Sequence, residues 1–224
     1  TAPNTSTDRT ITLPDATDTL IGTATSDALT TRINGAGGRK NILFNGAMNV
    51  AQRGTSTTGI TSGGYYTCDR WLFGSSIGTF TQTQSTDVPT GQGFATSMKL
   101  DCTTAESSIS TIDDLILLSQ RFEGQDLQHL KYGTSNAEST IVSFWVKSSK
   151  TGTYVLEMYN SDSGRQVAKS YTIDSANTWE KKTITYAGDT TGTYTNDNNR
   201  SLDFNFWLGA GTFYSSGTLP STWQ

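Results

Sequence analysis

The sequence predicts an all-β protein built as an antiparallel β-sandwich. Three observations lead to this prediction. Short apolar and aromatic segments alternate with polar residues at the period of a strand. They recur roughly every 10 to 15 residues, and Gly, Asn and Asp lie between them, which is typical of antiparallel sandwiches and barrels. No long amphipathic helix and no repeat of fixed period interrupts this pattern.

The expected strands follow one another along the chain from residue 41 onward. Ser139–Lys147 has a continuous apolar centre, so we expect it to be a central strand. The best helical candidate, Gln125–Leu130, is about two turns at most. The strands that we expect are Ile42–Phe44, Arg70–Phe73, Thr79–Gln84, Ser97–Cys102, Leu115–Phe122, Ser139–Lys147, Thr153–Tyr159, Gln166–Ile173, Trp179–Tyr186 and Leu202–Leu208.

Residues 1–38 differ from the rest and are expected to form a separate segment, before one domain at residues 39–224. Two short strands, Thr10–Pro14 and Asp18–Gly22, precede a brief helix at Ser26–Ile33. The segment has too few apolar side chains for a core of its own, so we expect a stalk packed against identical chains. A flexible leader is the alternative. A sandwich needs its last strands to close its sheets, so we also expect the native chain to continue past Gln224.

Composition excludes several classes of partner. The chain has 224 residues, a formal net charge of −4 and no basic run, which argues against nucleic acid and against a polybasic membrane contact. Its longest aliphatic run, Leu115–Leu118, is far too short to span a membrane. We therefore expect neither nucleic-acid binding nor membrane insertion, and no motif predicts a cofactor.

Four motifs resemble those of carbohydrate-binding modules with a jelly-roll fold. They are Asn41–Gly46, Ser119–Phe122, Ser143–Ser148 and Trp179-Glu180. The resemblance implies an antiparallel jelly-roll β-sandwich that binds sugar.

A closer resemblance is to tail-fibre and related structural proteins of bacteriophages, especially marine ones. Asn45–Gly54 followed by Asp69–Trp71 carries it, and the leader Arg9–Gly22 is similar to fibre segments of the same group. The resemblance implies a virion protein, usually a homotrimer, with the jelly roll at or near the distal end. It also implies that the N-terminal segment contacts other virion proteins.

Aromatic side chains in polar loops are the candidates for glycan binding. A sugar site combines an exposed aromatic plane with a few placed polar groups. Ordinary packing at the rim of the sandwich is the alternative for each of them. The candidates are Tyr65, Tyr66, Tyr159, Asn160, Tyr194, Asp197 and Tyr214.

Other reactive residues have simpler interpretations. His129 is the only histidine and is expected on the surface. A glycosidase site needs two carboxylates close together, and the sequence does not show which of its carboxylates meet. The candidates are Asp113, Asp114, Glu123 and Glu157. Asn160–Gly164 and Asn196–Asn199 could hold Ca²⁺, but such residues also form hairpin turns, and we predict no metal.

Several buried groups are expected as well. Cys68 and Cys102 are expected to be buried thiols, with a disulfide between them as the alternative. Core positions are predicted for Trp71, Trp145 and Trp207, and one charge of the Asp69-Arg70 pair is expected to be buried with a partner. Arg121 and Glu123 fall on one face of a strand, where they could form a pair.

Taken with the resemblance, these features predict a non-catalytic phage fibre protein that binds host surface glycan as a trimer. A capsid-decorating or tail-adaptor protein without a receptor role is the alternative. A polysaccharide-degrading enzyme is a third, less favoured interpretation.

Overall fold

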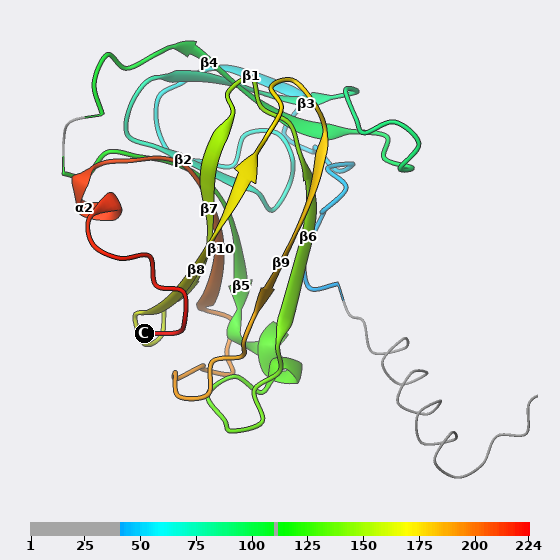
Figure 1. The fold of residues 1–224 in the computed structure, drawn as a ribbon. Helices are drawn as coiled ribbons and strands as arrows, with labels where there is room; N and C mark the ends of the chain where they lie inside the picture. The colour runs from blue at the N-terminus through cyan, green and yellow to red at the C-terminus, as the bar shows by residue number, and fades with distance from the viewer. Residues whose placement is uncertain (1–40, 110–111) are drawn as a thin grey trace, which may run out of the picture. The chain divides into compact units, whose positions relative to one another are not determined.

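The computed structural model describes residues 41–109 and 112–224. Within it, Leu43–Gln224 forms one unit whose regular secondary structure is almost entirely β-strand, with loops and turns between the strands (Figure 1). The predictions made for residues 1–38, including the stalk and its homotrimer, lie outside the described residues.

The elements follow the order expected from the sequence. Most expected strands are confirmed with ends that differ by one or two residues, and the short helix is confirmed as a 3₁₀ helix. The elements are β1 (Ser56–Ile60), β2 (Leu72–Ser75), β3 (Thr79–Ser85), β4 (Ser97–Thr104), β5 (Leu115–Glu123), η1 (Gly124–Leu130), β6 (Thr140–Val146), β7 (Gly152–Asn160), β8 (Arg165–Ile173), β9 (Glu180–Tyr186), β10 (Arg200–Ala210) and α2 (Thr212–Ser215).

One expected strand is wrong and one strand was not expected. Ile42–Phe44 leads into a turn at Asn45, whose φ of 50° no strand contains. The backbone of Phe44 hydrogen-bonds to the side chain of Gln120 rather than to a neighbouring strand. Its N–H donates to Oε1 at 2.7 Å, and its C=O accepts from Nε2 at 2.8 Å. Ser56–Ile60 contains Gly59 and too little alternation to predict a strand, yet it pairs with β3.

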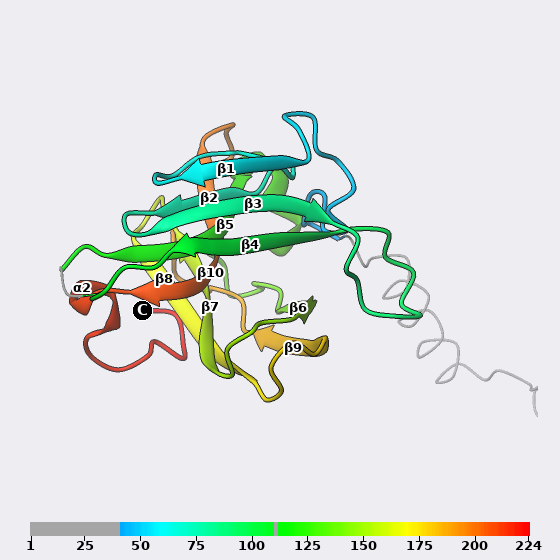
Figure 2. The ribbon, with the colours of Figure 1, turned by 90° about the horizontal axis from the view of Figure 1, so that it is seen from above.

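Antiparallel sheets pack face to face. The largest has the order β2-β5-β10-β7-β8, and the facing layer consists of β1-β3-β4 and β6-β9 (Figure 2). The registers place Phe73, Leu118 and Phe206 in one row on one face of the large sheet. Phe73 contacts Phe80 of β3, while Phe206 contacts Phe144 of β6, with ring centroids 5.0 and 5.1 Å apart. Both smaller sheets therefore cover the same face, which confirms the sandwich.

The facing layer is divided between β4 and β6. Among the described strands, β4 pairs only with β3 and β6 pairs only with β9, so the expectation of a central strand at Ser139–Lys147 is not met. Asp87 joins the two parts at one end, because it accepts hydrogen bonds from Lys147 at 2.6 Å and from Trp179 at 2.9 Å. The strand order is that of a jelly roll in which no described strand occupies the position between β4 and β6.

The core confirms some side-chain predictions and corrects others. Trp71 is buried at 3% exposure, as expected. Trp145 and Trp207 are only half-buried, because Trp145 lies on the divided layer and Trp207 on the outer face of the large sheet, where its Nε1 donates to Glu157. Cys68 is a buried free thiol, whereas Cys102 is exposed on β4, so the prediction of burial is wrong for Cys102.

The two expected charge pairings have different outcomes: Asp69 has a partner, whereas Arg121 and Glu123 do not pair with each other in the described part of the chain. Asp69 is half-buried and forms an ion pair with Arg53 at 3.2 Å. Within the described residues no ion pair joins Arg121 to Glu123, since Glu123 accepts instead from Gln125 at 2.7 Å. None of the helices in the described part of the chain has the length and apolar character needed to cross a bilayer.

Candidate functional site

The predicted glycan-binding residues do not converge on one site. Tyr65, Tyr159, Tyr194 and Asp197 lie near the end of the sandwich where β10 begins, in or beside the loops that meet there. Tyr214 follows the other end of β10, where it packs on Trp207 with ring centroids 5.1 Å apart. The residues near the start of β10 are therefore the ones that can act together.

Two of the predicted residues maintain turns. Asn160 is fully buried, its Nδ2 donates to the carbonyl of Thr193 and its Oδ1 accepts from the backbone of Asp162 and Ser163. It has no exposed polar atom for a sugar, which corrects its assignment. Asp197 accepts hydrogen bonds from the backbone and side chain of Asn199, and these hold its pKa below the ordinary value.

Tyr66 also has a structural role. Its hydroxyl donates to the carbonyl of Ser62 at 2.7 Å, and its ring packs against the buried side chains of Ile60, Phe73 and Phe80. Neighbouring Tyr65 is 38% exposed and has the Arg53 guanidinium over its ring at 5.8 Å. Of this pair, Tyr65 is the more exposed residue.

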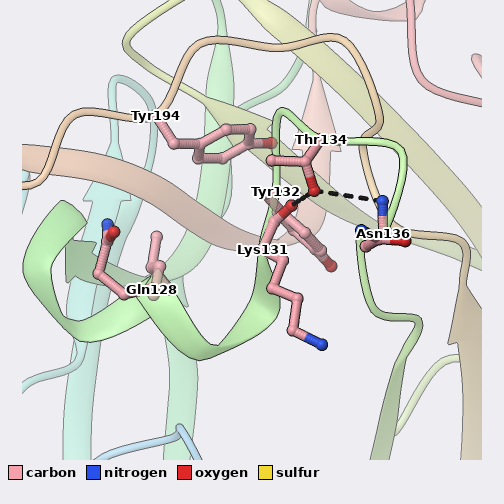
Figure 3. Close-up of a pocket in the computed structure, with 7 residues that line it drawn as sticks. Gln128, Lys131, Tyr132, Thr134, Asn136 and Tyr194 are labelled. Atoms are coloured by element: carbon pink, nitrogen blue, oxygen red, sulfur yellow. Dashed lines mark hydrogen bonds between the residues drawn. The ribbon is translucent and has the colours of Figure 1, made fainter.

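A pocket of about 390 Å³ lies beside η1 at the same end of the sandwich. Figure 3 shows its two aromatic rings together with a surrounding group of amide, hydroxyl and ammonium side chains. The rings of Tyr132 and Tyr194 meet edge to face, with centroids 5.3 Å apart. The lining residues are Leu127, Gln128, Lys131, Tyr132, Thr134, Asn136 and Tyr194.

The end of η1 positions one wall of this pocket. Lys131 ends the helix in the left-handed conformation, with φ of 53°, and its N–H donates to the carbonyl of Gln128. The reversal is continued by Thr134, whose hydroxyl donates to the Lys131 carbonyl at 2.7 Å and accepts from the N–H of Asn136 at 3.2 Å. These bonds fix the loop backbone that carries Lys131, Thr134 and Asn136.

Asp189 anchors the opposite wall. Its side chain is fully buried and accepts hydrogen bonds from Arg165, from the backbone of Thr191 and Gly192, and from the hydroxyl of Tyr194. Burial alone would raise the pKa of this carboxyl, but the bonds from Arg165 and the two backbone groups outweigh it and hold the pKa below its ordinary value. Asp189 is therefore a charged buried acceptor that fixes Tyr194.

Close backbone contact joins the two walls. Gly133 has φ of 82°, and its N–H donates to the carbonyl of Asp189 at 2.7 Å. A Cβ on Gly133 would overlap the carbonyl oxygen of Gly192, and a Cβ on Gly192 would overlap the carboxylate of Asp189. Only glycine permits this approach, so the two loops are locked together under the aromatic pair.

The two phenols of the pocket do not ionise at neutral pH. Burial raises the pKa of Tyr132 to about 12, and burial together with the charge of Asp189 raises that of Tyr194 further. Both phenols therefore stay protonated. The Lys131 ammonium is paired with Glu138 at 2.7 Å, whereas the side-chain amide of Asn136 makes no hydrogen bond with any described residue. This amide is available to a ligand.

Sequence reasoning found Tyr194 but missed Tyr132, Asp189 and the glycines. The available signal was the presence of Gly133 and Gly192 in polar segments. That signal indicates tight backbone geometry, but it does not reveal that segments so far apart in the chain contact each other.

Two of the residues considered for catalysis, His129 and Glu157, do not line this pocket. His129 is exposed on η1, as expected, and does not line the pocket. Glu157 is 8% exposed on the outer face of the large sheet, where its Oε2 accepts from Asn205 and Trp207. In the ranges 41–109 and 112–224, no three His, Cys, Asp or Glu residues are grouped so as to hold a metal ion.

Comparisons with known proteins give one distant structural likeness. No family model and no curated protein matches the chain. The fold is similar to the crystal structure of the enzymatically active domain of tailspike protein 4 from bacteriophage CBA120, with a TM-score of 0.41 and 18% identity. The match covers 76% of this chain and 20% of that one. A likeness of this size carries no argument about activity or substrate.

Proposed function

We propose that this protein is a phage fibre protein that binds host surface glycan without catalysis. The single observation that carries the binding role is the preformed pocket at Tyr132 and Tyr194, with its available Asn136 amide. Sugar sites combine aromatic or apolar contact with a few placed polar groups, and this pocket offers both. The assignment to a phage virion rests on the sequence motifs at Asn45–Gly54 and Asp69–Trp71.

The pocket is suited to weak and repeated binding rather than to tight single-site binding. It is open to solvent on a loop-rich end of the sandwich, and it offers one ring pair and few free polar groups. As part of a homotrimer attached through the N-terminal segment, three such pockets would bind one cell surface together. The effective concentration of the second and third sites then raises the overall avidity by orders of magnitude.

The test is binding of purified protein to immobilised bacterial lipopolysaccharides and capsular polysaccharides. Asn136→Ala removes an amide that makes no hydrogen bond to the described protein, so it should leave the melting temperature unchanged. It should weaken glycan binding about tenfold, the effect of losing one or two hydrogen bonds to a ligand. Gln92→Ala, an exposed amide between β3 and β4, is the matched control and should bind as the wild type does.

The outcomes separate the candidate functions. Binding that falls in Asn136→Ala but not in Gln92→Ala supports a glycan receptor role at this pocket. If the protein binds no polysaccharide at micromolar concentration, the glycan receptor role is wrong. The structural alternative, a capsid-decorating or tail-adaptor protein, then replaces that role. Release of reducing sugar ends during the same incubation would instead make the protein an enzyme.

A further inference from the structure

A second pocket, of about 200 Å³, lies beside the start of β10, and Asn198 of the connection between β9 and β10 lines it. It is lined by Tyr65, Arg70, Arg121, Phe122, Glu123, Asn198 and Arg200. Three arginines thus meet a single glutamate in a chain whose formal net charge is −4. Such a gathering of one sign of charge runs against the overall balance of the protein and favours an anionic ligand.

Two of the three arginines have contacts that hold their guanidinium groups in place. The guanidinium of Arg70 lies 4.5 Å from the centroid of the Phe44 ring, and Arg70 itself has φ of 70°. Arg200 donates from Nε to Asp203 at 2.8 Å and forms a second bond from Nη2, and its guanidinium also lies over the ring of Tyr159. Their orientation is therefore fixed before any ligand arrives.

Among the described residues, Arg121 and Arg70 are the arginines of this pocket without a carboxylate of their own, and Arg70 already lies over the Phe44 ring. The register partner of Arg121 on β10 is Asp203, but the ion pair of Asp203 is with Arg200. Glu123, the acidic residue in the pocket wall, accepts from Gln125 instead. Arg121 has no ion pair with any described residue, so its planar fork of donors can take a carboxylate in a bidentate manner.

Tyr65 adds an aromatic surface beside these charges. It is 38% exposed and lines the same pocket as Arg121 and Arg200. A ring next to guanidinium groups suits a ligand that has both a sugar face and a carboxylate. An inorganic anion would use the charges alone and gain nothing from the ring.

We propose that this pocket binds the carboxylate of an acidic sugar, such as a uronic acid, within the same glycan that occupies the Tyr132–Tyr194 pocket. The inference rests on the proposed glycan-binding function and names the class of its substrate. Asn198 and Tyr194 lie in one connecting segment, so the two pockets are neighbours along the same loop. A chain of neutral and acidic sugars could therefore occupy both.

The test is an NMR titration of ¹⁵N-labelled protein with glucuronate, glucose and inorganic phosphate, each used as a separate probe. Glucuronate should shift the amides around Arg121 and Tyr65 with an affinity at least tenfold tighter than that of glucose or phosphate. Arg121→Gln should remove most of this difference. Lys99→Gln, which removes one exposed positive charge on β4, should leave it intact.

Each result supports or overturns the assignment of an acidic sugar to this pocket. Equal binding of glucuronate and glucose, or binding that Arg121→Gln leaves unchanged, overturns the assignment of an acidic sugar. Phosphate that binds as tightly as glucuronate shows an anion site without a sugar. If the Asn136→Ala variant loses neutral-glycan binding while Arg121→Gln has no effect on any glycan, the proposed function stands and this inference alone fails.

Discussion

Arg165 and Asp189 form an ion pair that connects the edge strand β8 to the loop carrying Tyr194. The Nε of Arg165 donates to both carboxylate oxygens, at 3.2 and 3.1 Å. Asp189 is fully buried, while the side chain of Arg165 is 27% exposed. The pair is therefore the point at which the sheet fixes the geometry of the candidate site.

Replacing the buried carboxylate should destabilise the whole domain. Asp189→Ala leaves Arg165, the hydroxyl of Tyr194 and two backbone N–H groups without their acceptor, so we expect a loss of about 3 kcal/mol in the free energy of unfolding. Urea denaturation measures it. Asp101→Ala breaks an exposed pair with Lys99 and should cost no more than about 0.5 kcal/mol. Equal effects would contradict the anchoring role.

The same carboxyl should make stability depend on pH in acid. Its pKa is lowered in the folded state, so its contribution is fully present above the unfolded aspartate value of about 3.9. The contribution is lost as the pH falls through the lower folded value. The difference in unfolding free energy between the wild type and Asp189→Asn should therefore be constant from about pH 5 to 7 and shrink below about pH 4. A difference that stays unchanged into strong acid would show that the charge contributes nothing.

Gly133 should not accept a side chain. Its φ of 82° and its approach to the carbonyl of Gly192 predict that Gly133→Ala loses more than about 1 kcal/mol of stability. Gly46→Ala is the control, because the added carbon meets only the Leu43 side chain at 4.0 Å. Thermal melts of both variants check this, and a Gly133→Ala variant as stable as the control would mean that the loops are not locked.

The adjacent tyrosines should separate binding from stability. Tyr66→Ala removes a ring packed on the core around Phe73 and should cost about 2 kcal/mol of stability. Tyr65→Ala removes a half-exposed ring and should leave the melting temperature nearly unchanged while it weakens binding of an acidic sugar. The reverse order of stabilities would place Tyr65 in the core and remove it from the site.

The open edges of the facing layer should be visible in hydrogen exchange. Backbone N–H groups of β6 that do not point toward β9 have no strand partner among those described, so we expect them to exchange faster than the N–H groups of β7 and β10. Exchange measured by NMR on the purified protein would show this. Slow exchange along both edges of β6 would reveal a further strand paired there.

Sequence patterns predicted the strands well because alternation at period two is a local property. Gln166–Ile173 and Leu115–Phe122 match β8 and β5 nearly residue for residue. The prediction failed at Ile42–Phe44, a short apolar run in which the backbone of Phe44 bonds to the side chain of Gln120. It failed again for β6, whose apolar sequence indicates a central strand although only one edge is paired.

The candidate site was much less predictable, because its geometry depends on contacts between distant segments. Tyr132 meets Tyr194 only when the loops after η1 and β9 close on each other. Asn160 resembled a binding residue because it sits beside Tyr159 in a polar turn, but the same chemistry lets it cap that turn from within. Residue type indicated the chemistry, and only the fold decided which groups stay free.

The central claim is that the loops at the start of β10 bind glycan, and one measurement tests it most directly. The purified protein is applied to an array of neutral and acidic bacterial oligosaccharides, in parallel with Asn136→Ala and Arg121→Gln. We expect binding to oligosaccharides that contain uronic acid, weakened about tenfold in each variant. Binding to no oligosaccharide, or binding that neither variant weakens, would contradict the account.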